Sequence, residues 1–263
     1  MIPAPFEYVR ARSVEEALDA LGDGDARTLA GGQSLLPLMK LRLIRPSLIV
    51  DIGDLDLKGV DERGAEIRLG ALTTWDQVSH ADPLRRSELA ALAECAEGIG
   101  DLQVRNRGTL GGGLVHADPA ADVPAVALAL GVRLRLRSPA EEREVAADDF
   151  FTGPFMTALY RQELLTEVIV PTPPPGSGSA YVSVEHPASG FALAGAAALV
   201  LADGRERVAL TGVAGHAFVL DGSLGETEMM ADPYVSAAYR RALAEAVVGR
   251  ALERARARAE ANR

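Results

Sequence analysis

Two glycine clusters are the residues of this sequence best suited to chemistry. Gly31-Gly32-Gln33-Ser34 follows a short strand-like segment, and Thr109-Leu110-Gly111-Gly112-Gly113 repeats the small-residue pattern further along the chain. Consecutive glycines can turn several backbone N–H groups toward one anion, because glycine accepts positive φ and lets a ligand approach the main chain. Two such clusters that meet in space would suit a diphosphate. Taken alone, each cluster is equally typical of a tight turn.

Other chemistry-bearing patterns are weaker. Neither cluster fits G-x-G-x-x-G at a strand–helix junction, and neither precedes the lysine of a phosphate-binding P-loop. Asp118 and Asp122 could cap a helix or bind the ribose hydroxyls of a nucleotide. Together with His116 they could suggest a metal, but no third ligand of matching spacing follows, so we predict no metal site. No Ser/His/Asp order or nucleophile elbow stands out, and we predict no catalytic residue.

Composition excludes several classes of protein. The chain has 263 residues, 27 Lys+Arg against 37 Asp+Glu and a formal charge of −10, which disfavours binding to nucleic acid or anionic membranes. Its single cysteine, Cys95, excludes a disulfide framework, a thiolate zinc site and a cysteine-ligated iron–sulfur cluster in this chain. We see no transmembrane run and no signal peptide, so we expect a cytoplasmic protein.

The elements around the first cluster predict a small α/β unit over residues 1–54. Ser13 and Glu16 form a capping box, so a helix should begin at Val14 and end near Gly22. Strands are expected over residues 27–30 and 48–50.

The second cluster lies in a longer α/β unit, residues 55–173. Residues 66–72 alternate as a strand, and one helix should run from Asp82-Pro83 through Ala96. Residues 108–113 read as a glycine-dense turn, and helices could begin at both Asp118 and Asp122. Residues 132–137 alternate strictly, which puts three arginines on one solvated face of a strand.

A segment rich in Pro, Gly and Ser, residues 171–179, predicts a linker to a third unit, residues 174–263. A hairpin of residues 196–201 and 208–213 should follow. Asp232-Pro233 is expected to cap the last helix, whose basic end includes Arg254 and Arg258. We take that basic end as a hypothetical docking face.

Longer segments resemble a known family. Residues 30–42, AGGQSLLPLMKLR, resemble the first flavin-binding signature of the FAD-binding medium subunits of molybdenum hydroxylases. This is the family of carbon monoxide dehydrogenase and bacterial xanthine-dehydrogenase-type enzymes. Residues 103–124 resemble the second signature, and shorter matches at residues 6–10, 149–153, 185–192 and 236–241 extend the likeness over nearly the whole chain.

The resemblance implies an α+β fold. Two subdomains of the vanillyl-alcohol-oxidase (PCMH) type would hold FAD non-covalently between them, followed by a C-terminal α+β domain shortened between Val219 and Asp232. The main chain of residues 31–35 and 109–113 would hold the diphosphate, Asp122 the ribose or a nearby polar group, and Phe191 would flank the isoalloxazine. The cofactor-binding residues implied by the resemblance are Ala30, Gly31, Gly32, Gln33, Ser34, Leu35, Ile99, Thr109, Gly111, Gly112, Gly113, Ala117, Asp118, Asp122, Leu165 and Phe191.

The family also implies a function and partners. A large molybdenum–pterin subunit would oxidise the substrate, and two [2Fe–2S] clusters of a small subunit would pass the electrons to FAD in this chain. NAD⁺, a quinone or another acceptor would take them from there. Two departures stand out, because Gly113 replaces a more usual Asn or Ser and Ser183 a common lysine. The alternatives are a stand-alone flavin oxidase of the same fold and an assembly protein that has lost FAD.

Overall fold

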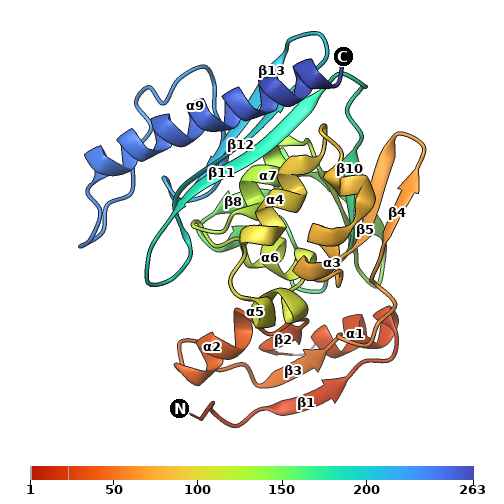
Figure 1. The fold of residues 1–263 in the computed structure, drawn as a ribbon. Coiled ribbons are helices and arrows are strands. Elements are labelled where there is room, and N and C mark those ends of the chain that lie inside the picture. Colours follow the sequence, from red (N-terminus) through yellow and green to blue (C-terminus); the bar gives the residue numbers. More distant parts are fainter. Residues whose placement is uncertain (1, 23) are drawn as a thin grey trace.

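The computed structural model describes residues 2–22 and 24–263. Within these residues the strands form three main sheets and one short ribbon, which follow one another from the N-terminal to the C-terminal part of the molecule (Figure 1). No helix in this part of the chain is long and apolar enough to cross a membrane.

The first sheet is parallel and carries the first glycine cluster at the end of one strand. Its order is β1 (Glu7–Arg10), β3 (Leu48–Asp51) and β2 (Ala26–Leu29), and the helices α1 (Val14–Leu21) and α2 (Leu35–Lys40) connect the strands. The Ser13 hydroxyl accepts the Glu16 amide as expected, which fixes the start of α1. The Glu16 carboxylate accepts the amide of Arg12 rather than that of Ser13.

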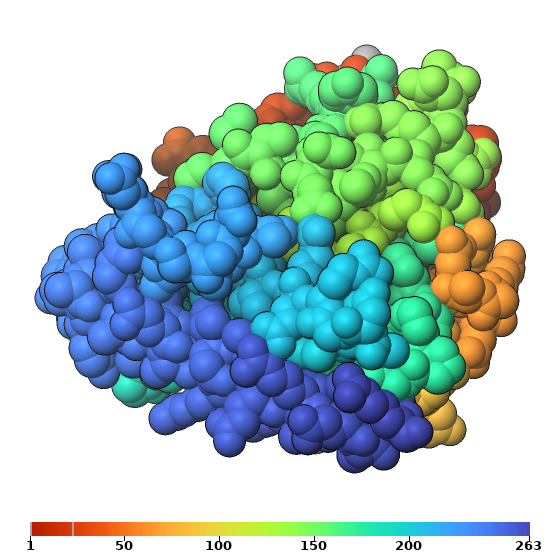
Figure 2. Space-filling view, turned by 90° about the horizontal axis from the view of Figure 1, so that it is seen from above, coloured from red at the N-terminus to blue at the C-terminus, as the bar shows by residue number. Residues whose placement is uncertain are grey.

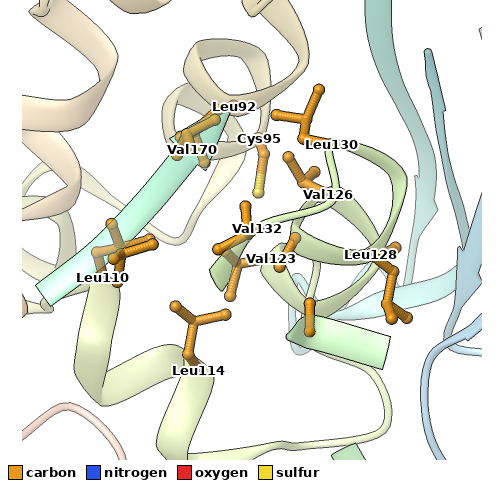
Figure 3. Packing of buried hydrophobic residues seen from close by; sticks show 14 of the residues in the cluster. Leu92, Cys95, Leu110, Leu114, Val123, Val126, Leu128, Leu130, Val132 and Val170 are labelled. Atoms are coloured by element: carbon orange, nitrogen blue, oxygen red, sulfur yellow. The ribbon is translucent and has the colours of Figure 1, made fainter. Parts of the chain in front are cut away.

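The second sheet is antiparallel, and helices cover one of its faces. In spatial order its strands are β4 (Val60–Arg63), β5 (Glu66–Gly70), β10 (Leu164–Pro171), β6 (Arg133–Arg137) and β7 (Glu142–Ala146). The helices are α3 (Trp75–His80), η1 (Asp82–Arg85), α4 (Ala90–Gly98), α5 (Leu102–Arg107), α6 (Leu110–His116), α7 (Val123–Ala129) and α8 (Ala147–Phe150). Cys95 lies in the apolar core between them, among Leu92, Val126 and Val132 (Figure 3).

The other face of this sheet carries the three predicted arginines. Arg133, Arg135 and Arg137 alternate with buried leucines, so the prediction of one arginine face is confirmed. The face is ion-paired rather than simply solvated. Three arginines and three glutamates of neighbouring strands form a closed ring of pairs with N–O distances of 2.6–3.4 Å, in the order Glu66, Arg68, Glu167, Arg135, Glu144 and Arg133.

The third sheet packs against the longest helix. Its strands are β11 (Gly178–Glu185), β12 (Ala192–Val200), β13 (Glu206–Thr211) and β14 (Phe218–Val219), all antiparallel, and they confirm the predicted hairpin. Helix α9 (Ala237–Ala261) covers β11 and β12 with a buried row of small residues. A ribbon of β8 (Phe151–Gly153) and β9 (Met156–Thr157) precedes this sheet. The cyan and blue C-terminal residues lie directly against the green middle residues (Figure 2).

Several local predictions are wrong for identifiable reasons. The expected helix from Asp82 is η1 followed by the separate helix α4, because Arg86 between them is extended. No helix begins at Asp118, whose carboxylate instead accepts the Ala120 amide in a turn. The final helix begins at Ala237, capped by Ser236, since the Asp232 carboxylate binds the amides of Tyr234 and Val235.

The predicted linker is not a free segment. Pro171 ends β10 and Gly178 begins β11, so only a short loop separates the two sheets. Ser177 and Ser179 are completely buried, and a Cβ at Gly178 would lie 2.3 Å from the Ala255 carbonyl oxygen of α9. The domain boundaries after residues 54 and 173 remain our proposal. The hydrophobic cores extend across both boundaries, because Leu164 packs with the first sheet and Tyr181 with the second.

The basic end of α9 is a junction within the chain. Arg254 and Arg258 both donate to the Glu94 carboxylate of α4, at 3.2 and 2.6 Å, and the other Glu94 oxygen accepts the Tyr181 amide of β11 at 2.9 Å. Glu94 therefore joins α4, α9 and β11. These contacts argue against the hypothetical docking face, because Arg254 and Arg258 already bind a carboxylate within the chain.

We expect Glu94→Ala to lower the melting temperature of the chain by about 5 °C or more, since charge-assisted hydrogen bonds from three donors are lost. Glu97→Ala on the same helix is the control. Its partner Arg85 is 53% exposed and Glu97 itself 54%, so the control should change melting by less than about 2 °C. Calorimetry of both variants tests this, and equal shifts would contradict the role of Glu94.

Candidate functional site

The first glycine cluster lies against the residues that directly precede the second. The first lies between β2 and α2, and the second follows α5 (Figure 1). A Cβ on Gly31 would lie 2.0 Å from the carbonyl oxygen of Arg107 and 2.8 Å from the Cα of Gly108. Only glycine allows this backbone contact, because real Cβ atoms do not approach other atoms so closely.

The first cluster has free amides. Within the described residues, the backbone N–H groups of residues 31–35 donate no hydrogen bond to the chain. Gly32 has φ +76°, and the segment leads into the N-terminus of α2. Backbone amides that lack acceptors within the chain at a helix start can bind an anion, because they combine unpaired N–H donors with the positive end of the helix dipole. This segment, which we call the 31–35 loop, fits a phosphate group.

The second cluster is built differently, and the predicted turn is wrong. Gly111, Gly112 and Gly113 lie inside helix α6. The amides of this segment already have acceptors, in the order Leu110 to Thr73 O, Gly111 to Ala71 O, Gly112 to Thr109 Oγ1 and Gly113 to Thr109 O. A diphosphate would find no free amide among them. The contact predicted for Thr109, Gly111, Gly112 and Gly113 stays a prediction.

Trp75 packs against one glycine before α6 and one within it, and the sequence analysis missed this contact. A Cβ on Gly108 would lie 2.8 Å from its indole ring, and one on Gly113 would lie 2.7 Å from the far edge of the same ring. A larger side chain at position 113 would displace the indole, which accounts for the departure from Asn or Ser. The sequence does single this residue out, because Trp75 is the only tryptophan and follows two threonines.

The C-terminal sheet holds the segment after α6, which we call the 118–122 loop. Ala117 adopts the left-handed conformation, with φ 48° and ψ 43°, and ends the helix. The Gly212 amide donates to the Pro119 carbonyl at 2.8 Å, and the Ala192 amide donates to the Ala120 carbonyl at 3.2 Å. Phe191, 47% exposed, directly precedes Ala192. The structure thus brings Ala117, the 118–122 loop and Phe191 together.

Asp122 has a partner that the sequence did not indicate. The Tyr181 hydroxyl of β11 donates to its carboxylate, and Gly195 leaves room for that hydroxyl. Burial, the largest cause, raises the pKa of Asp122 to about 6, while the bond from Tyr181 opposes that rise and the Glu185 charge adds to it. The ribose role predicted for Asp122 stays a prediction, because this carboxylate is already engaged. No local pattern marks Tyr181 as its partner.

The two apolar positions predicted to contact a cofactor lie deeper. Leu165 is 5% exposed in the core of the second sheet, and Ile99 packs against the same core. Their predicted roles remain predictions. A hollow of about 530 Å³ contains none of the predicted site residues, and it lies on the arginine face beside Arg68 and Arg135. Those two guanidinium groups are ion-paired, so we do not assign the hollow to a cofactor.

Comparison with known proteins places this site in a family. Residues 4–173 match the FAD binding domain in molybdopterin dehydrogenase. The chain belongs to this family, the FAD-binding medium subunits of the molybdenum-hydroxylase class of oxidoreductases.

Individual relatives agree with this class. The chain is 38% identical to the carbon monoxide dehydrogenase medium chain of Hydrogenophaga pseudoflava over 254 residues, 94% of this chain and 88% of that one. It is 41% identical to the glyceraldehyde dehydrogenase medium chain of Sulfolobus acidocaldarius over 208 residues, 78% of this chain and 73% of that one. A solved carbon monoxide dehydrogenase of H. pseudoflava matches with a TM-score of 0.93 and 37% identity, over 98% of this chain and 99% of that one. The predicted α+β FAD-binding fold is confirmed.

The buried carboxyl of Asp122 predicts a pH-dependent stability. Because the pKa of Asp122 is about 6 in the folded chain, against 3.8 for an ordinary Asp, the folded chain keeps a proton that the unfolded chain loses between those values. Asp122 should therefore contribute a fall of roughly 3 kcal/mol in stability as pH rises through this window, while carboxylates with lowered pKa values such as Glu66 and Glu144 contribute a rise in its lower part. Asp122→Asn, which keeps an acceptor for Tyr181, should remove the contribution of Asp122 and unfold at higher urea concentration at pH 8.

Urea unfolding from pH 4 to pH 8 measures this difference. Asp118→Asn is the matched control, since its carboxylate accepts one backbone amide in the same loop. The control should keep the wild-type pH dependence. An Asp122→Asn protein with the wild-type slope would show that Asp122 titrates normally.

Proposed function

We propose that this chain binds FAD with its 31–35 loop and passes electrons from a partner subunit to an external acceptor. The carrying observation is the row of free amides at residues 31–35, held against Arg107 and Gly108 by a contact that only glycine permits. An N–H row at a helix start suits the FAD diphosphate, which is the anionic part of that cofactor. The family match over residues 4–173 supports the choice of FAD among diphosphate ligands.

The remaining site residues would position the cofactor. The Ser34 side chain makes no capping bond to α2, which leaves its hydroxyl free to donate to a phosphate oxygen. Phe191, half exposed beside the 118–122 loop, would lie against the isoalloxazine ring. FAD supplies the redox chemistry, accepting electrons singly and releasing one or two. The chain needs no general acid or base, because its task is to bind, orient and shield the ring.

The lone buried cysteine supports a division of labour among subunits. Cys95 is 1% exposed, and burial raises the pKa of its thiol well above the ordinary value. One such thiol cannot ligate a [2Fe–2S] cluster, which takes four protein ligands. We therefore assign the clusters to a small subunit and the molybdenum–pterin centre to a large one. NAD⁺ or a quinone is the proposed acceptor.

Gly31→Ala should weaken FAD binding about tenfold or more, because its Cβ forces the 31–35 loop away from Arg107. Gly249→Ala is the control, since an added Cβ there meets nothing within 4 Å and the residue is helical, away from positive φ. Fluorescence titration of both variants with FAD, beside the visible spectrum of the desalted wild-type chain, measures the effect. Equal affinities would contradict the assignment of this loop.

The electron-transfer step needs the assembled complex. Co-expressed with its two partner subunits, the chain should retain about one FAD, and reduced complex should be reoxidised by NAD⁺ or a quinone. If the chain holds no FAD, either alone or in the complex, the proposed function is wrong.

A further inference from the structure

One buried arginine of α9 binds three separate segments of the chain. Arg240 is 4% exposed. Its Nη1 donates to the carbonyl oxygens of Leu193 at 2.8 Å and Gly212 at 2.5 Å, and its Nη2 donates to the Asp232 carboxylate at 2.6 Å. A buried guanidinium needs such partners, because its charge is costly to desolvate.

Two of these partners lead directly to the 118–122 loop. Leu193 follows Ala192, whose amide binds the Ala120 carbonyl. Gly212, at φ +76°, donates its own amide to the Pro119 carbonyl. The Arg240 guanidinium therefore connects the segments at Leu193 and Gly212, which hydrogen-bond the 118–122 loop. One of them begins next to Phe191.

The third partner supports the loop that carries Phe191. Asp232 accepts the amides of Tyr234 and Val235, which shapes the turn before α9. The Tyr234 ring lies edge-on to the His186 ring, with centroids 5.9 Å apart. The His186 amide in turn binds the Phe191 carbonyl, so this turn and the Phe191 loop lie side by side.

The two Nη atoms make all the hydrogen bonds of this guanidinium, because the buried Nε of Arg240 has no hydrogen-bond partner within the described residues. The neighbouring Arg241 also binds backbone carbonyls, but those of Gly225 and Thr227, outside the site. The geometry at Arg240 is specific to the segments around Phe191 and the 118–122 loop.

We propose that Arg240 is a positioning residue of the cofactor site. It fixes Phe191 relative to the 118–122 loop and so sets the place of the isoalloxazine ring. This inference rests on the proposed function of the site. A lysine cannot replace it, because a single ammonium lacks the planar fork that reaches two carbonyls and a carboxylate at once.

Arg240→Lys tests the inference, with Arg241→Lys as the matched control on the same helix. FAD titration should give a dissociation constant at least about tenfold higher for Arg240→Lys, measured well below its melting temperature. The visible circular dichroism of the bound flavin should also change, because this signal reports the asymmetric surroundings of the ring. Arg241→Lys should keep the wild-type affinity and spectrum.

A merely structural role gives a different result. In that case Arg240→Lys would melt at a lower temperature, while its folded fraction would bind FAD with wild-type affinity and spectrum, which overturns the inference. Should Arg240→Lys fail to fold, Asp232→Ala decides, since it removes the carboxylate partner and leaves both carbonyl bonds. It must weaken FAD binding relative to Asp221→Ala, an exposed control, and equal affinities overturn the inference.

The failure of the proposed function is separately visible. A wild-type chain without FAD, alone and in the complex, would overturn both proposals. A wild-type chain that binds FAD, beside an Arg240→Lys chain that binds it equally well, would overturn the positioning role alone.

Discussion

The site depends on one contact between two backbones. Gly31 lies so close to the Arg107 carbonyl that no Cβ fits, and this contact joins the parallel first sheet to the helices of the second. The contact with Arg107 positions the 31–35 loop, although the amides of the loop make no hydrogen bond within the described chain. Backbone amides can then offer an anion-binding surface on a protein with a net charge of −10.

The C-terminal sheet positions another segment with predicted site residues. It fixes the 118–122 loop through backbone hydrogen bonds from Ala192 and Gly212. Glu94 and Arg240 then hold this sheet in place, one through α4 and the other through α9. The two charged groups are placed where separate parts of the chain must keep a fixed geometry, which apolar packing alone enforces less strictly.

The predictions that succeeded depend on local physics. A Ser13 cap fixes the start of α1, and strict alternation fixes the arginine face of β6, because neither needs a distant partner. Helix α6 was predicted as a turn because three consecutive glycines disfavour a helix, and its contact with Trp75 overrides that propensity. Tyr181, the partner of Asp122, and the two carbonyl partners of Arg240 lie far away in the sequence, so no local pattern could reveal them.

The two glycine clusters show why a motif alone does not identify a ligand contact. The two clusters have similar compositions. In both, glycine lets another part of the chain approach the backbone more closely than a side chain would allow. They differ in where their N–H groups go, since those of residues 31–35 have no acceptor in the described chain and those of residues 110–113 are all bonded. Free amides favour an anion at residues 31–35. The glycines of the second cluster instead let α6 pack closely against Ala71 and Trp75, and their contact with a diphosphate stays a prediction.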